Sequence, residues 1–88
     1  MTKKDLEERG WIFSYEFDNI LHFDKGDTWK DDGNGAFLYF DTKINNITII
    51  TTDKGFNMDG PVSSPKFNGT CENIDTFDFI CKLIRLKI

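Results

Sequence analysis

The chain has 88 residues, enough for one domain spanning residues 1–88, and its 15 acidic and 11 basic side chains give a formal net charge of −4. This balance argues against direct nucleic-acid binding and against docking on anionic membranes, because both depend on Lys and Arg meeting phosphates. Nine Phe, two Trp and two Tyr can fill a core without metal or disulfide staples.

Residues 3–9 are expected to form a short helix. Thr2 is a suitable N-cap, and Gly10 suits the position just after a helix end. Leu6 is the one large apolar residue in this segment, so the helix must pack on the rest of the chain to be stable.

The clearest pattern runs from residue 11 to residue 18, where large and polar side chains alternate. Trp11, Phe13, Tyr15 and Phe17 fall on one side of an extended strand. Period-two alternation of this kind indicates a half-buried β-strand. We therefore expect these four rings to lie together beneath a cover of helices.

A hairpin follows this strand. Residues 18–19 (Asp-Asn) favour a turn, and residues 20–24 predict a second strand that directs Leu21 and Phe23 inward.

Two further strands complete an antiparallel meander. Residues 36–41 form a continuous apolar run, and residues 47–52 are rich in β-branched Ile and Thr. Residues 53–70 hold three Gly and both Pro and are expected to be mainly loop, with a short edge strand over 65–68.

A second helix is expected over residues 74–85, with Asn73 as its N-cap. Its apolar residues share one stripe at helical spacing: Phe77, Ile80, Cys81 and Ile84. The predicted fold class is therefore α+β, a four- to five-stranded antiparallel meander sheet with a short N-terminal helix and a C-terminal helix packed on one face.

The N-terminal segment and the cysteines predict a cytoplasmic protein. Residues 1–8 turn acidic where a signal peptide needs an apolar stretch, and nothing approaches the ~20 apolar residues of a membrane span. Cys71 and Cys81 are too few for a disulfide framework and lack metal-ligand spacing, so two reduced thiols are expected.

Common catalytic motifs are not found in the sequence. There is no glycine-rich phosphate loop, no His-Glu-x-x-His and no Gly-x-Ser-x-Gly, so no cofactor, metal or catalytic residue is assigned. His22 could act as a base with a neighbouring carboxylate, and Cys71 could be a nucleophile, although a half-exposed structural histidine is the simpler interpretation. The acidic segment 24–34 departs from the EF-hand order and leaves only a looser cation site open.

Trp29 is the most suggestive single residue for partner binding. It lies among the carboxylates Asp27, Asp31 and Asp32 on a polar loop, and Trp is enriched at interface hot spots. Folding back over the sheet edge is the alternative for this ring.

A second candidate for partner binding is the long loop after the fourth predicted strand. It carries Phe56 and Met58, and long loops in small domains are often functional. Plugging of the core by Phe56 is the competing interpretation.

The layout of the chain carries a resemblance. Segment 6–11 (Leu-Glu-Glu-Arg-Gly-Trp) leads from a helix through Gly into an aromatic strand, and segment 67–69 (Phe-Asn-Gly) precedes a helix with Phe77, Ile80 and Leu83. In this layout, and in its heavy use of Ile, Asn, Lys and Phe, the chain resembles the small uncharacterised proteins of AT-rich bacteria and their phages. Some proteins of that kind are anti-defence factors, including anti-CRISPR proteins, which block a larger complex. The resemblance implies an inhibitor in the cytoplasm of a bacterium or of a phage-infected host cell, and it transfers no functional residue.

The leading hypothesis is a non-enzymatic protein that binds and inhibits a larger protein or protein–nucleic-acid complex through a basic surface of that partner. One alternative is a protein that sequesters a nucleotide signal, with Lys54 or Lys66 meeting a phosphate. Another is a small hydrolase that uses His22 or Cys71.

A homodimer is also possible through the sheet face opposite the helices. Ile12, Ile20, Leu38 and Ile50 are expected to form an apolar patch there.

Overall fold

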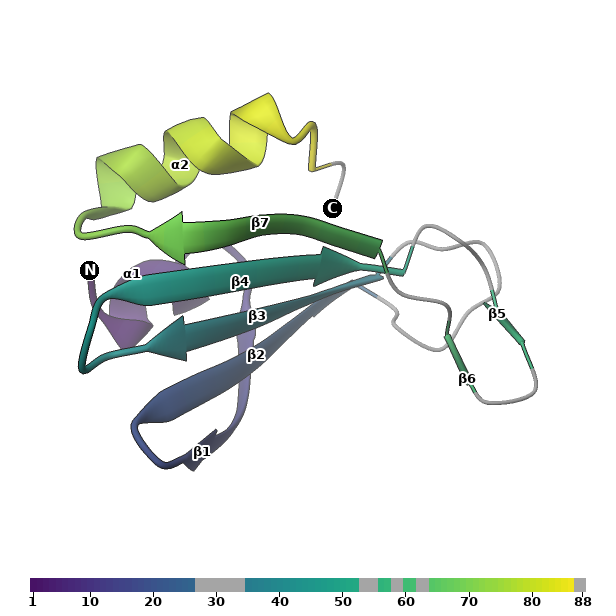
Figure 1. Ribbon diagram of the computed structural model, residues 1–88, viewed down its shortest axis with the longest axis horizontal. Coiled ribbons are helices and arrows are strands. Elements are labelled where there is room, and N and C mark those ends of the chain that lie inside the picture. Colours follow the sequence, from purple (N-terminus) through teal and green to yellow (C-terminus); the bar gives the residue numbers. More distant parts are fainter. Residues whose placement is uncertain (27–34, 53–55, 58–59, 62–63, 87–88) are drawn as a thin grey trace.

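The structure is a computed structural model that describes residues 1–26, 35–52, 56–57, 60–61 and 64–86 (Figure 1). Its elements in chain order are α1 (Lys3–Glu7), β1 (Ile12–Phe17), β2 (Ile20–Gly26), β3 (Gly35–Asp41), β4 (Asn46–Thr51), β5 (Phe56–Asn57), β6 (Gly60–Pro61), β7 (Ser64–Thr70) and α2 (Ile74–Leu83). Five strands form one antiparallel sheet in the order β1-β2-β3-β4-β7, and β5 pairs with β6 in a separate two-stranded ladder. The predicted α+β meander is confirmed, and the expected edge strand over 65–68 is the longer strand β7.

Short turns with left-handed backbone set the register of the sheet. Asp18 and Asn19, between β1 and β2, have φ of 54° and 70°. Two consecutive positive φ angles are the mark of the type I′ hairpin turn, whose twist matches that of paired strands. Asn45 has φ of 53° in the turn between β3 and β4. Asp and Asn tolerate this conformation better than other non-glycine residues, which explains their place here.

Helix α1 is shorter than the predicted 3–9. Its start matches the prediction, because the Thr2 hydroxyl accepts from the Asp5 N–H while the Asp5 carboxylate accepts from the Thr2 N–H. After Glu7 the chain tightens, and the N–H groups of Arg9 and Gly10 bond carbonyls three residues back. Gly10, at φ 88°, then turns the chain into β1.

Helix α2 also ends earlier than the predicted 74–85, at Leu83. The Leu86 N–H donates to the Cys81 carbonyl at 3.0 Å and the Arg85 N–H donates to the Lys82 carbonyl at 3.2 Å. This pair of bonds is the Schellman motif, which requires a left-handed residue after the helix, and Arg85 takes that conformation with φ 55°. The sequence lacks the glycine that usually announces such an end.

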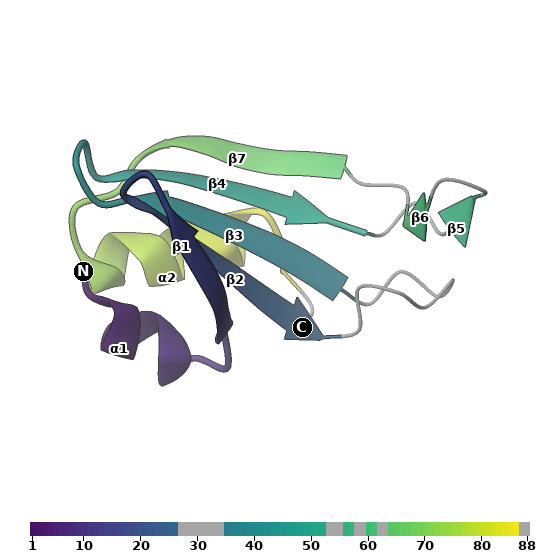
Figure 2. The same cartoon turned by 90° about the horizontal axis from the view of Figure 1, so that it is seen from below.

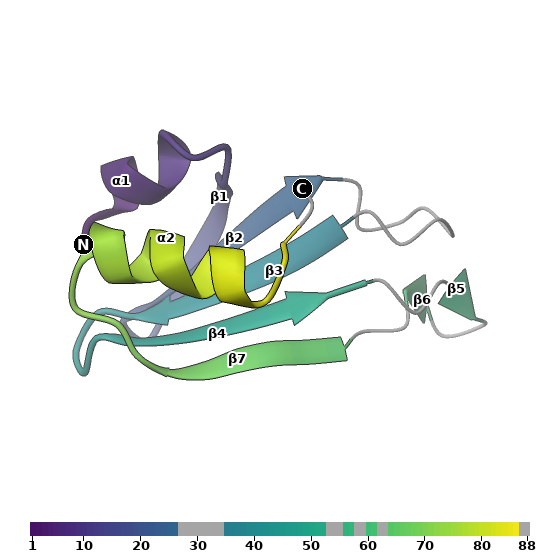
Figure 3. The same ribbon diagram turned by 90° about the horizontal axis from the view of Figure 1, so that it is seen from above.

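Both helices pack on one face of the sheet, as predicted (Figure 3). The buried cluster joins residues of α1, α2 and the sheet: Leu6, Trp11, Leu21, Phe23, Ala36, Leu38, Phe40, Ile47, Ile49, Cys71, Phe77 and Ile80. An ion pair between Arg9, just after α1, and Asp78 of α2 links the two helices at the surface. Burial of these apolar groups is the main stabilising term, at roughly 25 cal/mol per Å² removed from water.

The expectation that four aromatic rings of β1 lie together in the core is wrong for two of them. Trp11 is buried and Phe13 packs against the core, whereas Tyr15 is 54% and Phe17 is 71% exposed. A β-bulge at Ser14 is the cause, because Phe13 pairs with Phe23 while Tyr15 pairs with the very next residue of β2, His22. The extra residue reverses the alternation, so Tyr15 and Phe17 face the opposite side of the sheet.

Leu38 requires a second correction. It was expected on the face opposite the helices, but it is fully buried within the core on the helix side. In β3 the alternation directs Ala36, Leu38 and Phe40 to the helices and Phe37 and Tyr39 away from them.

Candidate protein-binding face

The side of the sheet away from the helices is the candidate site, and we call it the open face. Seen from that side, the strands face the viewer and neither helix crosses them (Figure 2). Its outward apolar and aromatic residues come from four strands: Ile12, Tyr15, Phe17, Ile20, His22, Phe37, Tyr39 and Ile50. Ile12, Tyr15 and Phe17 are among the exposed large hydrophobic residues of the described chain. Contiguous apolar groups of this kind on a surface mark an interaction site.

Three rings form a ladder across β1, β2 and β3 at the centre of the open face. Tyr15 is stacked on His22 with ring centroids 4.1 Å apart, and His22 meets Tyr39 edge-on at 4.6 Å. His22 is the register partner of both tyrosines, so the strand pairing itself brings the rings together. Partial burial raises the pKa of the Tyr39 phenol, and the neighbouring Tyr15 and Asp24 act in the same direction. The ladder therefore offers three adjoining rings with polar tips, and the phenol of Tyr39 is uncharged at neutral pH.

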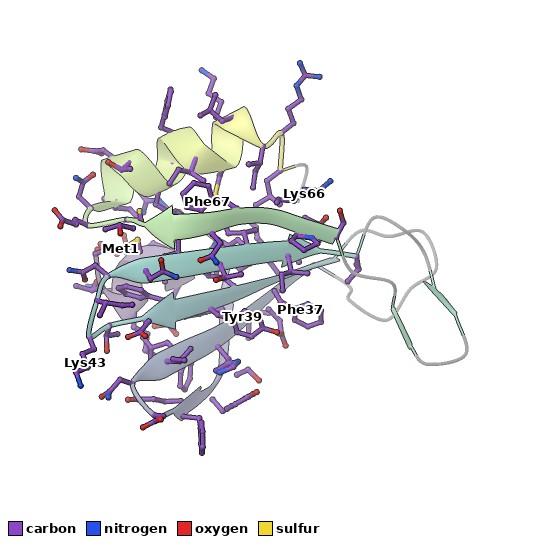
Figure 4. All side chains as sticks on the ribbon, viewed as in Figure 1. Met1, Phe37, Tyr39, Lys43, Lys66 and Phe67 are labelled. Carbon is purple, nitrogen blue, oxygen red and sulfur yellow. The ribbon has the colours of Figure 1, made fainter. Side chains whose placement is uncertain are left out.

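Phe37 continues this aromatic surface along β3. Figure 4 shows Phe37 and Tyr39 projecting from the same strand on the same side. Phe37 pairs with Ile50 of β4 and with Asp24 of β2, so it lies between an aliphatic and an acidic neighbour. The apolar area thus reaches from the edge strand β1 to β4.

Carboxylates flank the aromatic ladder. Asp24 pairs with Ile12 and Asp41 pairs with Ile20, which places both acidic groups on the open face. The outward positions of β1, β2 and β3 that the structure describes hold no Lys or Arg. Among the described residues of these three strands, this part of the face combines aromatic rings with two carboxylates, of which Asp41 accepts a hydrogen bond from the Lys43 N–H.

At the start of β4, around Asn46 and Thr48, the β4–β7 part of the open face is polar. The side-chain amide of Asn46 donates to the side-chain oxygen Oδ1 of Asn68 at 2.9 Å, and the Thr48 hydroxyl donates to the same oxygen at 3.2 Å. These side chains satisfy one another, so they bound the aromatic area on one side.

Most residues that the sequence singled out for partner binding lie outside the described residues. Trp29, Asp27, Asp31, Asp32 and Met58 belong to this group, as does most of the segment 24–34 considered for a cation.

Phe56 is described only as part of the backbone of β5. The sequence patterns indicated the loops that carry Trp29 and Phe56, and they did not indicate the ladder of rings on the sheet.

The structure separates the two residues of the hydrolase alternative. His22 lies on the open face, whereas Cys71 is buried in the core on the helix side. Burial raises the pKa of the Cys71 thiol, although its hydrogen bond to the Asn73 carbonyl acts in the opposite direction. A protonated, enclosed thiol facing away from the histidine cannot be activated by it.

Within the described part of the chain, no group of three or more His, Cys, Asp or Glu side chains is placed to hold a metal ion. Across the same residues, no helix has the length and apolar character needed to cross a membrane. No protein-family model, curated protein or solved structure matches the chain in sequence or fold comparisons.

Proposed function

We propose that the chain is a non-enzymatic binding protein whose open face attaches to a larger protein. The observation that carries this proposal is the ladder Tyr15–His22–Tyr39 on the sheet face that no helix covers, where Tyr15 is exposed, His22 and Tyr39 are half-buried, and Phe17 and Phe37 continue the ladder. Tyr and other large rings supply most of the binding energy at protein interfaces, because they bury much area while losing little side-chain freedom. The rings project from strands of a five-stranded sheet, so the backbone at the interface loses little conformational entropy on binding.

The charges of the open face favour a partner with a basic surface. Asp24 and Asp41 lie within the aromatic area, and the chain as a whole carries a net charge of −4. Complementary charge accelerates association and excludes partners of the same sign. Two copies meeting through this face would bring their carboxylates together, so a homodimer is disfavoured relative to a basic partner.

Inhibition is the proposed outcome of this binding. Basic protein surfaces with exposed apolar groups commonly hold nucleic acid, and an acidic, aromatic face competes for the same groups. An anti-defence inhibitor, as the resemblance in layout implies, fits this mode of action.

The test starts with capture of the partner on the immobilised chain from the cells that naturally make it, followed by mass spectrometry. Binding of the purified partner is then measured by calorimetry for Phe17→Ala, Tyr15→Ala and the matched control Phe79→Ala. Phe79 is 60% exposed on α2, so the control removes an equally exposed ring from the helix side.

We expect Phe17→Ala and Tyr15→Ala each to weaken binding by about 10-fold or more, since hot-spot rings cost about 2 kcal/mol when truncated. Phe79→Ala should bind within about twofold of the parent. Equal affinities for parent and Phe17→Ala, or an equal loss in Phe79→Ala, would contradict the proposal. A concentration-dependent dimer that Phe17→Ala abolishes, seen by sedimentation, would assign the face to a second copy instead.

A further inference from the structure

A pocket on the helix side of the molecule lies apart from the open face. Its volume is about 280 Å³, and it opens between the end of α1, the strand β2 and the helix α2. The residues that matter for its chemistry are Arg9, Trp11, Lys25, Phe77, Asp78 and Lys82. Pockets for small molecules typically measure about 300–1,000 Å³, so this one lies just below that range and suits a small ligand.

The charge of the pocket is opposite to that of the whole chain. Arg9, Lys25 and Lys82 line it together with one carboxylate, Asp78, which leaves an excess of two positive charges (3 − 1) in a chain of net charge −4. Asp78 is already engaged, because the Arg9 guanidinium donates two hydrogen bonds to it at 2.6 and 2.9 Å. Among the lining residues, Lys25 and Lys82 therefore have no carboxylate of their own. A pocket with this excess of positive charge favours an anionic ligand.

Lys25 is held in place rather than extended into solvent. Its ammonium donates to the Arg9 carbonyl at 2.8 Å and lies 5.4 Å from the centre of the Trp11 ring. An ammonium has three donor hydrogens, and this contact with the backbone occupies one of them. Its position is fixed in advance, which lowers the entropy lost when an anion binds.

The inner wall of the pocket is apolar. Trp11 and Phe77 meet edge-to-face with ring centroids 6.3 Å apart. Cys81 also lines the pocket, and burial, the largest cause, raises the pKa of its thiol to about 11, so at neutral pH it adds no negative charge. Trp11 and Phe77 are only 2% and 1% exposed, so the wall offers the edges of their rings to a ligand with a small apolar body and an anionic end.

We propose that this pocket binds a small organic anion, a carboxylate or phosphate monoester with a flat apolar body. Lys25 and Lys82 contact the anionic group, and the edges of Trp11 and Phe77 contact the body. The bound anion joins β2 to α2, and its binding is independent of the partner proposed for the open face.

The experiment is a titration of the ¹⁵N-labelled chain with phenyl phosphate and with benzoate, followed by two-dimensional NMR. Benzyl alcohol, which has a similar body and no charge, serves as the neutral control. We expect saturable shifts at the Trp11 indole N–H and the Lys82 amide with the anions and none of comparable size with the alcohol. The stronger response identifies a phosphate or a carboxylate as the preferred end group.

Lys82→Gln should weaken anion binding about tenfold, in line with the loss of one charge-assisted hydrogen bond. Lys82 is exposed, so this variant keeps the fold. The matched control is Lys43→Gln, whose side chain projects from the β3–β4 turn (Figure 4) and should leave the affinity unchanged. Shifts that do not saturate, that benzyl alcohol reproduces or that Lys82→Gln leaves unaltered would each overturn the assignment. Phe17→Ala should titrate like the parent, which keeps this test separate from that of the open face.

Discussion

Replacing Thr52 with Val tests how the end of the sheet is held. Thr52 is 0% exposed, and its hydroxyl donates to the Gly35 carbonyl and accepts from the Gly35 N–H, each at 3.1 Å. Val keeps the shape but removes this acceptor from a buried N–H, which costs about 1–3 kcal/mol. In the variant the Gly35 carbonyl still accepts a hydrogen bond from the backbone N–H of residue 52, at 2.9 Å in the parent. The Gly35 N–H is therefore the one group left without a partner. We therefore expect a net loss of about 1–2 kcal/mol in the free energy of unfolding.

Thr48→Val is the matched control in the same strand region. The Thr48 hydroxyl also donates a hydrogen bond, to Asn68 at 3.2 Å, but it lies on the open face, where water can replace the lost partner. The expected change is within about 0.5 kcal/mol. Urea unfolding followed by tryptophan fluorescence gives both values, provided that the slope with urea is unchanged. The reasoning fails if Thr52→Val loses no more stability than Thr48→Val.

Three further outcomes are expected. Arg85→Gly should raise the free energy of unfolding by about 1 kcal/mol in urea, because glycine adopts a φ of 55° without the steric cost that Arg bears; a lower stability would contradict the helix end described above. Deletion of Ser14 should leave a cooperatively folded protein within about 1 kcal/mol of the parent, because the residues on either side of it already pair with consecutive residues of β2; an unfolded variant, judged by circular dichroism, would show that the bulge is required. The hydrogen bond from Arg9 lowers the pKa of Asp78 below its usual 3.8, so the stability this carboxylate contributes is full above about pH 4 and is lost as the pH falls through its folded pKa. Between about pH 5 and pH 2, the free energy of unfolding of Asp78→Asn should accordingly fall by less than that of the parent, as measured by urea unfolding at both pH values. An equal fall in the two proteins would refute the role of the ion pair.

The order and type of the elements could be predicted from local patterns. Alternation marked β1 and β2, a continuous apolar run marked β3, and β-branched residues marked β4. Helical spacing marked α2, and Thr2 and Asn73 marked both helix starts correctly. The ends were less predictable, because the turn after α2 relies on Arg85 in a conformation that the sequence does not announce. Tertiary packing overrides the weak local preference at that position.

The candidate site could not be predicted, since it depends on where one strand breaks its alternation. Nothing in the sequence distinguishes Ser14 from an ordinary outward residue, yet the bulge there reverses the direction of Tyr15 and Phe17. The regular alternation of the sequence therefore predicted Tyr15 and Phe17 in the core. It did place His22 correctly on the less apolar side of β2, where the register with Tyr39 completes the ladder.

The strand order also has a consequence for how the chain acquires its shape. From β1 to β4 each strand pairs with the one before it in the chain, so the sheet can grow by successive short-range hairpins, whose closure costs little entropy. Helix α2 comes last and meets α1 through contacts between the two ends of the sequence, such as Arg9 with Asp78. Substitutions in α2 should then mainly change the rate of unfolding, and substitutions in the central hairpins should mainly change the rate of folding.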